Sequence, residues 1–284
     1  MTLVLAWLSN DALCVIADTR LSAGHKVSVD AAPKIYAVPI VLHSPILTDG
    51  PLRCAPMGFT FAGHTAAGHM TNALATAGLQ ALRSEDEPRA PKVEQVANYF
   101  ARCAVSVVEE IRSHYPADLA SFEGLVFGWE GEGPLAYSFE VAWVHGPKAI
   151  AQVELMDFTK FGMYAIGKGH RIAQAHIESE WQANRKATAY SALQAVIADE
   201  HEPSVGGSLQ CAITTQYGTE LKAVLEVNEF GQAFGGFMGA GGGHLGMIGD
   251  LVPFGSGPVV LGPRREKNVE GSCPAGWCNS GYPR

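Results

Sequence analysis

Three side chains within the first 34 residues could together carry out an acyl transfer. Thr2 directly follows the initiator Met1, and a residue as small as threonine allows an aminopeptidase to remove that methionine. Thr2 would then carry a free α-amine beside its own hydroxyl, so that one residue supplies both the nucleophile and the proton acceptor. An α-amine titrates at about 7.7–8.0, close to working pH, where a general base is most useful.

Lys34 and Asp18 could supply the charges that this chemistry needs. A cation near the threonine hydroxyl lowers the pKa of that hydroxyl and directs its proton to the amine. Lys34 stands at the start of the apolar run 35–38, where a lysine is poorly placed to serve solubility alone. A partly buried lysine must be paired, and Asp18 is the implied partner. The alternative interpretation is a solvated lysine and a turn aspartate at the end of a strand.

These residues resemble the proteasome β-subunit family of N-terminal nucleophile (Ntn) threonine hydrolases, and the peptidase subunit of the bacterial two-component protease. The resemblance consists of the run Ala17-Asp18-Thr19-Arg20 and the intervals of 16 and 32 residues from Thr2 to Asp18 and Lys34. Residues 61–66, Phe-Ala-Gly-His-Thr-Ala, resemble the Ala-Gly-x-x-Ala element that opens the first helix of the family. The resemblance covers about residues 2–229.

The resemblance implies roles for the matched positions. Thr2 would be the nucleophile, Asp18 would orient Lys34, and the backbone N–H of Gly63 would stabilise the oxyanion. The wall that receives the residue before the scissile bond would be lined by Leu21, Ala32, Phe61 and Thr65. Arg20, expected to be mainly structural, and Lys168 are further candidates for substrate contact.

Two stretches depart from the family pattern. The family has Gly-Ser-Gly where this chain has Gly167-Lys168-Gly169, and that serine normally contacts the N-terminal threonine. A lysine there would either depress the pKa of the amine or point away from it. In the run 202–206, Val205 stands at the position of the second family serine, and Ser204, one place earlier, is the candidate substitute.

Composition excludes several other classes of protein. The formal net charge of −8 gives no basic footprint for nucleic acid. No apolar run reaches the roughly 18 residues that a membrane span needs, and the first residues lack the basic region of a signal peptide. Six cysteines in 284 residues are too few for a disulfide scaffold, so a cytoplasmic location is expected. His64 with His69, and Cys273 with Cys278, lack the further ligands of a metal site, so neither metal nor cofactor is expected.

Hydrophobic periodicity predicts the elements that must position these residues. Strands are predicted over 2–9, 12–18, 34–39, 57–62, 122–129, 134–144, 149–155, 163–166, 209–215 and 221–227. Helices are predicted over 64–82, 93–111, 169–181 and 187–199, and Ala66, Met70, Ala73, Leu74 and Ala77 share one face of the first. The proline-containing stretch 40–56 is predicted as a loop that overhangs the pocket beside Thr2.

This order of elements predicts an α+β fold, for which the pattern alone permits several layer arrangements. The resemblance selects the four-layer αββα sandwich of a proteasome subunit, formed by residues 1–229. Fifteen of the 32 glycines fall in residues 230–284, so this second segment is predicted to be an extended or partly disordered tail.

The resulting functional expectation is a threonine-type endopeptidase that acts on peptides or unfolded proteins inside a ring-like homo-oligomer. A separate ATP-dependent unfoldase could feed such a ring. Two alternatives stay open: a small-molecule Ntn amidase, and a non-catalytic assembly subunit of the same fold.

Overall fold

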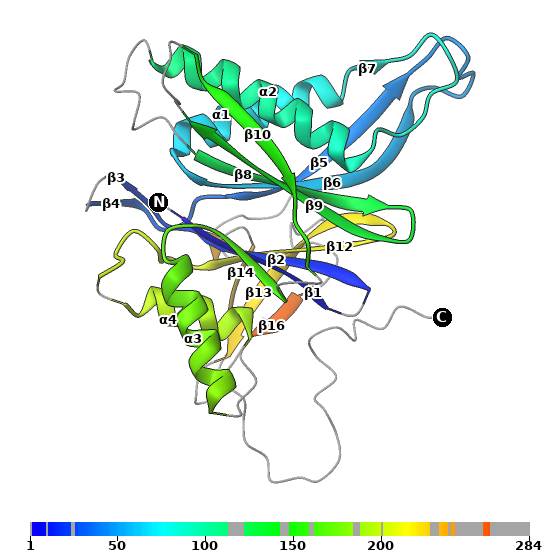
Figure 1. Cartoon of the computed structure of the whole chain (residues 1–284). Helices are drawn as coiled ribbons and strands as arrows, with labels where there is room; N and C mark the ends of the chain where they lie inside the picture. The colour runs from blue at the N-terminus through cyan, green and yellow to red at the C-terminus, as the bar shows by residue number, and fades with distance from the viewer. Residues whose placement is uncertain are drawn as a thin grey trace, which may run out of the picture.

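The computed structural model describes residues 2–9, 11–23, 26–112, 122–142, 148–158, 162–183, 188–199, 201–227, 233–237, 240–241 and 258–261. These residues form an α+β fold with several sheets, as predicted (Figure 1). None of the helices in these ranges has the length and apolar character needed to cross a membrane. Met1, Cys273 and Cys278 lie outside the described residues.

The larger sheet has the strand order β11-β1-β2-β12-β13-β14-β15, and β16 pairs with β13. Its strands are β1 (Leu3–Ser9), β2 (Ala12–Asp18), β11 (Met163–Gly167), β12 (Leu209–Thr215), β13 (Gly218–Val227), β14 (Ala233–Phe237), β15 (Ala240–Gly241) and β16 (Pro258–Leu261). The predicted pairing of the first two strands is confirmed, with Val4 opposite Ala17. From the glycine-rich segment, the described residues belong to β14, β15 and β16.

The second sheet has the strand order β10-β9-β8-β6-β5-β7. Its strands are β5 (Ile35–His43), β6 (Leu52–Gly63), β7 (Leu82–Arg83), β8 (Phe122–Glu130), β9 (Gly133–Ala142) and β10 (Ile150–Leu155). A separate two-stranded ribbon, β3 (Leu21–Ala23) with β4 (Lys26–Val29), lies between the last residue of β2 and the first of β5 in the chain.

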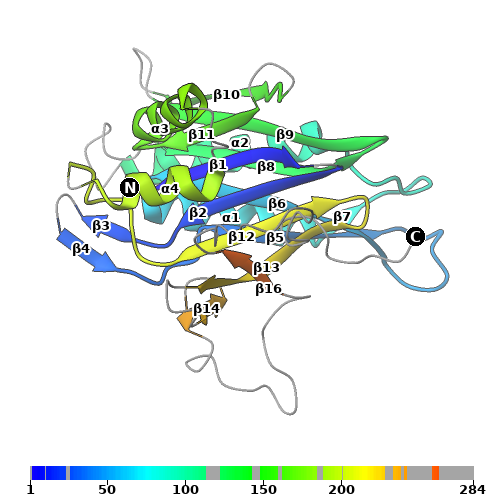
Figure 2. The same cartoon turned by 90° about the horizontal axis from the view of Figure 1, so that it is seen from below.

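Two pairs of helices pack against the two sheets. Helices α1 (Thr65–Leu79) and α2 (Val93–Arg112) lie on the second sheet, and α3 (His170–Gln182) and α4 (Ala189–Ile197) lie on the larger one (Figures 1 and 2). One apolar cluster, which includes Phe59 and Phe100, joins α1 and α2 to their sheet. A second, with Leu5 and Leu193, joins α3 and α4 to the larger sheet. A third, with Phe127, fills the space between the sheets.

The prediction of a loop over residues 40–56 is wrong, because most of that stretch belongs to the paired strands β5 and β6. Ile35 pairs with Thr60 at one end of this hairpin and Leu42 pairs with Leu52 at the other. Pro39 is accommodated where the register shifts between Val38 and Ile40, since a bulge tolerates a residue without an N–H. The connecting residues 44–51 therefore lie at the far end of β5 from Lys34 and do not overhang the site.

The buried face of α1 consists of small residues. Ala67, Gly68, Thr71, Ala75 and Leu79 are buried, whereas Met70 and Leu74 of the Ala66–Ala77 face are each 47% exposed. A Cβ at Gly68 would lie 2.3 Å from the ring of Phe61. Apart from Leu79 at its last position, the helix therefore approaches the sheet through small residues and leaves Met70 and Leu74 largely exposed.

Substituting Phe59→Ala should lower the free energy of unfolding by about 3–5 kcal/mol, because it empties a fully buried site. The Phe59 ring is 0% exposed and lies 4.4 Å, centroid to centroid, from that of Phe100. Urea denaturation followed by circular dichroism measures the loss. The control is Leu74→Ala on the exposed face of α1, for which about 0.5 kcal/mol or less is expected. Similar losses for the two variants would contradict the assigned core.

Candidate functional site

A buried ion pair between Asp18 and Lys34 forms the centre of the candidate site. Asp18 is the last residue of β2, and Lys34 directly precedes β5. The Nζ atom of Lys34 lies 3.0 Å from Oδ2 of Asp18, and both side chains are fully buried. Nζ also donates a hydrogen bond to the backbone carbonyl of Arg20 at 2.5 Å. The predicted pairing of these two residues is therefore present in the structure.

The carboxylate of Asp18 connects Lys34 to the beginning of the chain. Its Oδ1 accepts a hydrogen bond of 2.9 Å from the backbone N–H of Leu3, which is the amide that follows Thr2. Its Oδ2 accepts from the N–H groups of Arg20 and Gly206, each at 3.1 Å, in addition to Lys34. Burial raises the pKa of Asp18, and the Lys34 ammonium with the N–H groups of Leu3 and Gly206 opposes this shift by stabilising the ionised carboxylate.

Burial lowers the pKa of Lys34 below that of a lysine in water, and the negative charge of Asp18 opposes this shift. The positive charge of Arg20 adds to the lowering. A lysine in this setting releases its proton more readily than an exposed lysine does. That property suits a group that assists proton transfer.

Thr2 lies against the turn that follows β11. Its carbonyl accepts a 3.0 Å hydrogen bond from the backbone N–H of Lys168, whose side chain is exposed. Gly167 has a φ of +90°, and a Cβ there would lie 2.0 Å from the Thr2 carbonyl oxygen and 2.6 Å from Cβ of Ala62. Only glycine permits this approach. Thr2 itself is 2% exposed.

Gly63 ends β6 directly after Ala62 and has a φ of +114°. The residue before Gly63, Ala62, lies against Gly167, which in turn lies against the carbonyl of Thr2. Gly63 is therefore close to Thr2 in the fold. The following residue, His64, caps α1 by accepting a hydrogen bond of 3.1 Å from the N–H of Ala67. The strand-to-helix turn expected from the sequence is therefore present.

Arg20 holds the loop 203–206 beside the ion pair. Its guanidinium lies 2.7 Å from the carboxylate of Asp30 and donates to the carbonyl of Pro203 at 3.1 Å. A Cβ at Gly206 would lie 2.6 Å from Cζ of Arg20, so a side chain at that position would displace the guanidinium. These contacts give Arg20 a structural role, which is to hold the loop 203–206 in position.

Ser204 lies in the same loop but does not supply the contact to Asp18. It is buried, and its hydroxyl donates to the carboxylate of Glu202. The loop reaches Asp18 through the backbone of Gly206. Val205 packs into the apolar cluster beneath α3 and α4.

The four residues predicted to line a substrate wall lie on four different segments of the fold. Phe61 is fully buried, with its ring 5.2 Å from that of His69 on α1. Leu21, on the ribbon β3, and Thr65, at the first position of α1, are half-buried. Ala32 is buried in the segment that leads to Lys34.

Tyr36 and His69 form a polar contact that the sequence pattern did not reveal. The Tyr36 hydroxyl donates to the carbonyl of Pro33 at 2.6 Å and lies 2.7 Å from Nδ1 of His69. Since this hydroxyl has one proton, His69 must carry a proton on Nδ1 and donate it to Tyr36. Burial, and secondarily the charge of Lys34, lower the pKa of His69.

Two further polar side chains, one buried and one half-buried, were not predicted from the sequence. Gln210 on β12 is 1% exposed and bonds to the backbone of the segment around Lys34. Glu123 on β8 accepts a 3.0 Å hydrogen bond from the N–H of Gly167. The available signal was a polar residue within an otherwise apolar strand.

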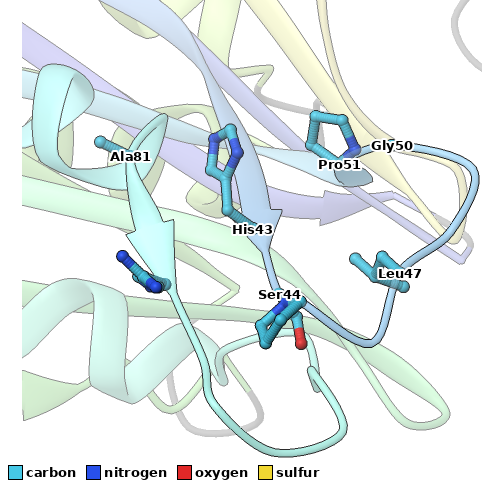
Figure 3. A pocket seen from close by; sticks show the side chains of 8 residues that line it. His43, Ser44, Leu47, Gly50, Pro51 and Ala81 are labelled. Atoms are coloured by element: carbon cyan, nitrogen blue, oxygen red, sulfur yellow. The ribbon is translucent and has the colours of Figure 1, made fainter.

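A hollow of about 500 Å³ lies elsewhere, at the end of β5 that is distant from Lys34 (Figure 3). His43, Ser44, Leu47 and Ala81 are among its lining residues. It shares no residue with the Asp18–Lys34 site. Across the described part of the chain, no three His, Cys, Asp or Glu side chains gather as a metal site would require.

Removing the charge of either Asp18 or Lys34 alone should destabilise the fold. Asp18→Asn and Lys34→Met should each lower the free energy of unfolding by about 3–5 kcal/mol, because each leaves a buried charge uncompensated. The double variant should lose less than the sum of the single losses, as urea denaturation would show. Lys92→Met, which removes an exposed lysine 4.0 Å from Glu130, is the control and should cost about 1 kcal/mol at most. Strict additivity would contradict the coupling.

Acidification should destabilise the fold through His69. Because its pKa is lowered in the folded state, the unfolded chain binds the proton more strongly, so stability is lost as pH falls below about 6.5. His69→Gln should reduce this dependence, measured by urea denaturation between pH 5.5 and 7.5. The exposed His43→Gln is the matched control. An unchanged pH dependence in His69→Gln would show that His69 does not contribute.

Comparison with known proteins assigns no family. A scan of the sequence against models of protein families finds no match, and a search of curated proteins finds none either. The function is therefore inferred from the residues around Asp18 and Lys34.

Proposed function

We propose that this chain is a threonine-type Ntn peptidase of the proteasome β type, with Thr2 as its nucleophile after removal of Met1. The observation that carries the proposal is the bridging carboxylate of Asp18. It binds the ammonium of Lys34 on one side and the amide next to Thr2 on the other. One carboxylate thereby links a buried cation to the amide that follows Thr2, the residue that offers a hydroxyl and, after processing, an amine.

In the proposed reaction, Oγ of Thr2 attacks the carbonyl carbon of a peptide bond. The α-amine of Thr2 takes the hydroxyl proton and passes it to the departing amine, which leaves an ester between Thr2 and the acyl part of the substrate. Water, deprotonated by the same amine, then attacks the ester and releases the acid. Lys34 lowers the pKa of the hydroxyl, and the N–H of Gly63 stabilises the oxyanion.

The packing of the described elements supports the same proposal. Two helices lie on each sheet, and an apolar cluster lies between the sheets. We assign this arrangement to the four-layer αββα sandwich of the Ntn class. The chemistry requires no cofactor. Peptides or unfolded proteins are the proposed substrates, in a ring of copies of this chain served by a separate ATP-dependent unfoldase.

A non-catalytic assembly subunit is the second candidate. It is favoured by the loop 202–206, in which the Ser204 hydroxyl is bonded to Glu202 and Val205 is buried. Neither side chain is thereby offered to Thr2. A small-molecule amidase with the same nucleophile would differ from the peptidase in its substrate and its oligomeric state.

Intact-mass spectrometry and a threonine-reactive β-lactone test the nucleophile. The protein should lack Met1 and should acquire one lactone on Thr2, located by peptide mapping. Thr2→Ala should abolish labelling and lower turnover of a fluorogenic peptide by about 10³-fold or more, because the nucleophile and its hydroxyl proton are lost.

Thr48→Ala, which changes an exposed threonine in the loop after β5, is the matched control and should leave labelling and turnover unchanged. Retention of Met1, or full labelling of Thr2→Ala, would refute the peptidase proposal and favour the assembly subunit. Labelling of Thr2 without peptide cleavage, in a protein that is monomeric or dimeric, would favour the amidase.

A further inference from the structure

The segment that delivers Lys34 to the site has no strand partner of its own. β4 ends at Val29 and β5 begins at Ile35, yet Ala32 and Lys34 in between are buried. Buried backbone N–H and C=O groups need partners, because leaving one unpaired costs about 1–3 kcal/mol. The N–H of Ala32 donates to the carbonyl of Thr19 at 3.0 Å, and the carbonyl of Pro33 accepts from Tyr36. The carbonyl of Ala32 and the N–H groups of Lys34 and Ile35 are bonded by one side chain, that of Gln210 on β12.

Gln210 binds this segment at three points. Its Oε1 accepts hydrogen bonds from the backbone N–H of Lys34 at 2.8 Å and from that of Ile35 at 2.9 Å. Its Nε2 donates to the carbonyl of Ala32 at 2.6 Å. The acceptor and the donor end of one planar amide are thus both engaged, and the side chain is 1% exposed. For these three backbone groups, the carboxamide supplies the hydrogen bonds that a neighbouring strand would otherwise provide.

The strand that carries Gln210 lies beside the strand that carries Asp18. In the pairing of β12 with β2, Leu209 is opposite Asp18 and Gln210 is opposite Ala17. Lys34 is therefore held at both ends by adjacent strands of the larger sheet, its ammonium by Asp18 and its backbone N–H by Gln210. The distance between these two anchors is determined by strand pairing.

We propose that Gln210 is a positioning residue, which sets where the ammonium of Lys34 lies relative to Thr2. It acts through the backbone of Lys34 and touches no reacting atom. Its effect on catalysis rests on the proposed function, whereas its effect on Lys34 does not. The alternative is a purely structural glutamine. Its loss would lower the stability of the fold and leave the position of the Lys34 ammonium relative to Thr2 unchanged.

Thr214 provides the matched control for this distinction. It lies on β12, on the same face as Gln210, is fully buried, and its hydroxyl lies 2.7 Å from that of Thr219. Thr214→Val removes a buried hydrogen bond from the same strand without touching the segment 32–35. Gln210→Met removes all three bonds at similar side-chain volume. Gln210→Glu keeps the acceptor atoms but, when ionised, cannot donate to Ala32.

Peptide turnover is the first measurement. Gln210→Met should lower kcat by about 10- to 100-fold with KM changed little, because a displacement of the order of 1 Å is enough for such a loss. Gln210→Glu should fall between wild type and Gln210→Met, and Thr214→Val should keep the wild-type kcat. Equal kcat values for Gln210→Met and Thr214→Val, or a change confined to KM, would overturn the proposal.

The second measurement does not depend on catalysis. In protein labelled with ¹⁵N-lysine, the side-chain Nζ resonance of Lys34, assigned by its loss in Lys34→Met, should shift in Gln210→Met and not in Thr214→Val. An unchanged resonance in Gln210→Met would overturn the positioning role. If wild type neither cleaves peptides nor labels at Thr2, the peptidase proposal fails, and this resonance alone decides whether Gln210 positions Lys34.

Discussion

Burying the charge of Lys34 is the constraint on which the rest of the site depends. An isolated ammonium cannot remain charged in an apolar interior, so the fold must supply an anion and further acceptors. Asp18 supplies the anion at the end of β2, and the backbone carbonyl of Arg20 supplies a second acceptor. The same carboxylate must then be satisfied, which draws in the N–H groups of Leu3 and Gly206. Segments distant in sequence are thus joined by the hydrogen-bonding needs of one pair.

The Asp18–Lys34 pair could be predicted from the sequence, because each residue stands out from the apolar strand next to it. A lysine at the head of an apolar strand requires a partner, and an aspartate at the end of another strand can provide it. Gln210 is marked as a polar residue within an apolar strand, but this signal does not identify its partner, because its role depends on β12 lying beside β2 and on its bonds to the segment 32–35. Ser204 was predicted from its place in the chain, whereas the contact that reaches Asp18 comes from the backbone of Gly206, to which side-chain chemistry gives no clue.

The helices and strands were predicted well where the apolar residues followed one clear pattern, as in β1, β2, α2 and the β8–β9 hairpin. The stretch 40–56 was misread because its prolines suggested a loop, and a register shift at Pro39 let the strand continue. For α1, the choice of buried face was made by a tertiary contact, the approach of Gly68 to the ring of Phe61, which periodicity cannot show. The order of elements predicted an α+β fold but left the arrangement into two sheets open, because several layerings cover the same apolar strand faces.

The ribbon β3–β4 has a consequence for motion. Its two strands pair only with each other, and the contacts at its base are those of Arg20 and Thr19 with Asp30. Two strands alone are marginally stable in water, so we expect this ribbon to open locally at a lower free energy than either large sheet. Because Arg20, at the base of the ribbon, supplies a carbonyl that binds the ammonium of Lys34, this two-stranded ribbon is directly continuous with a fully buried charge.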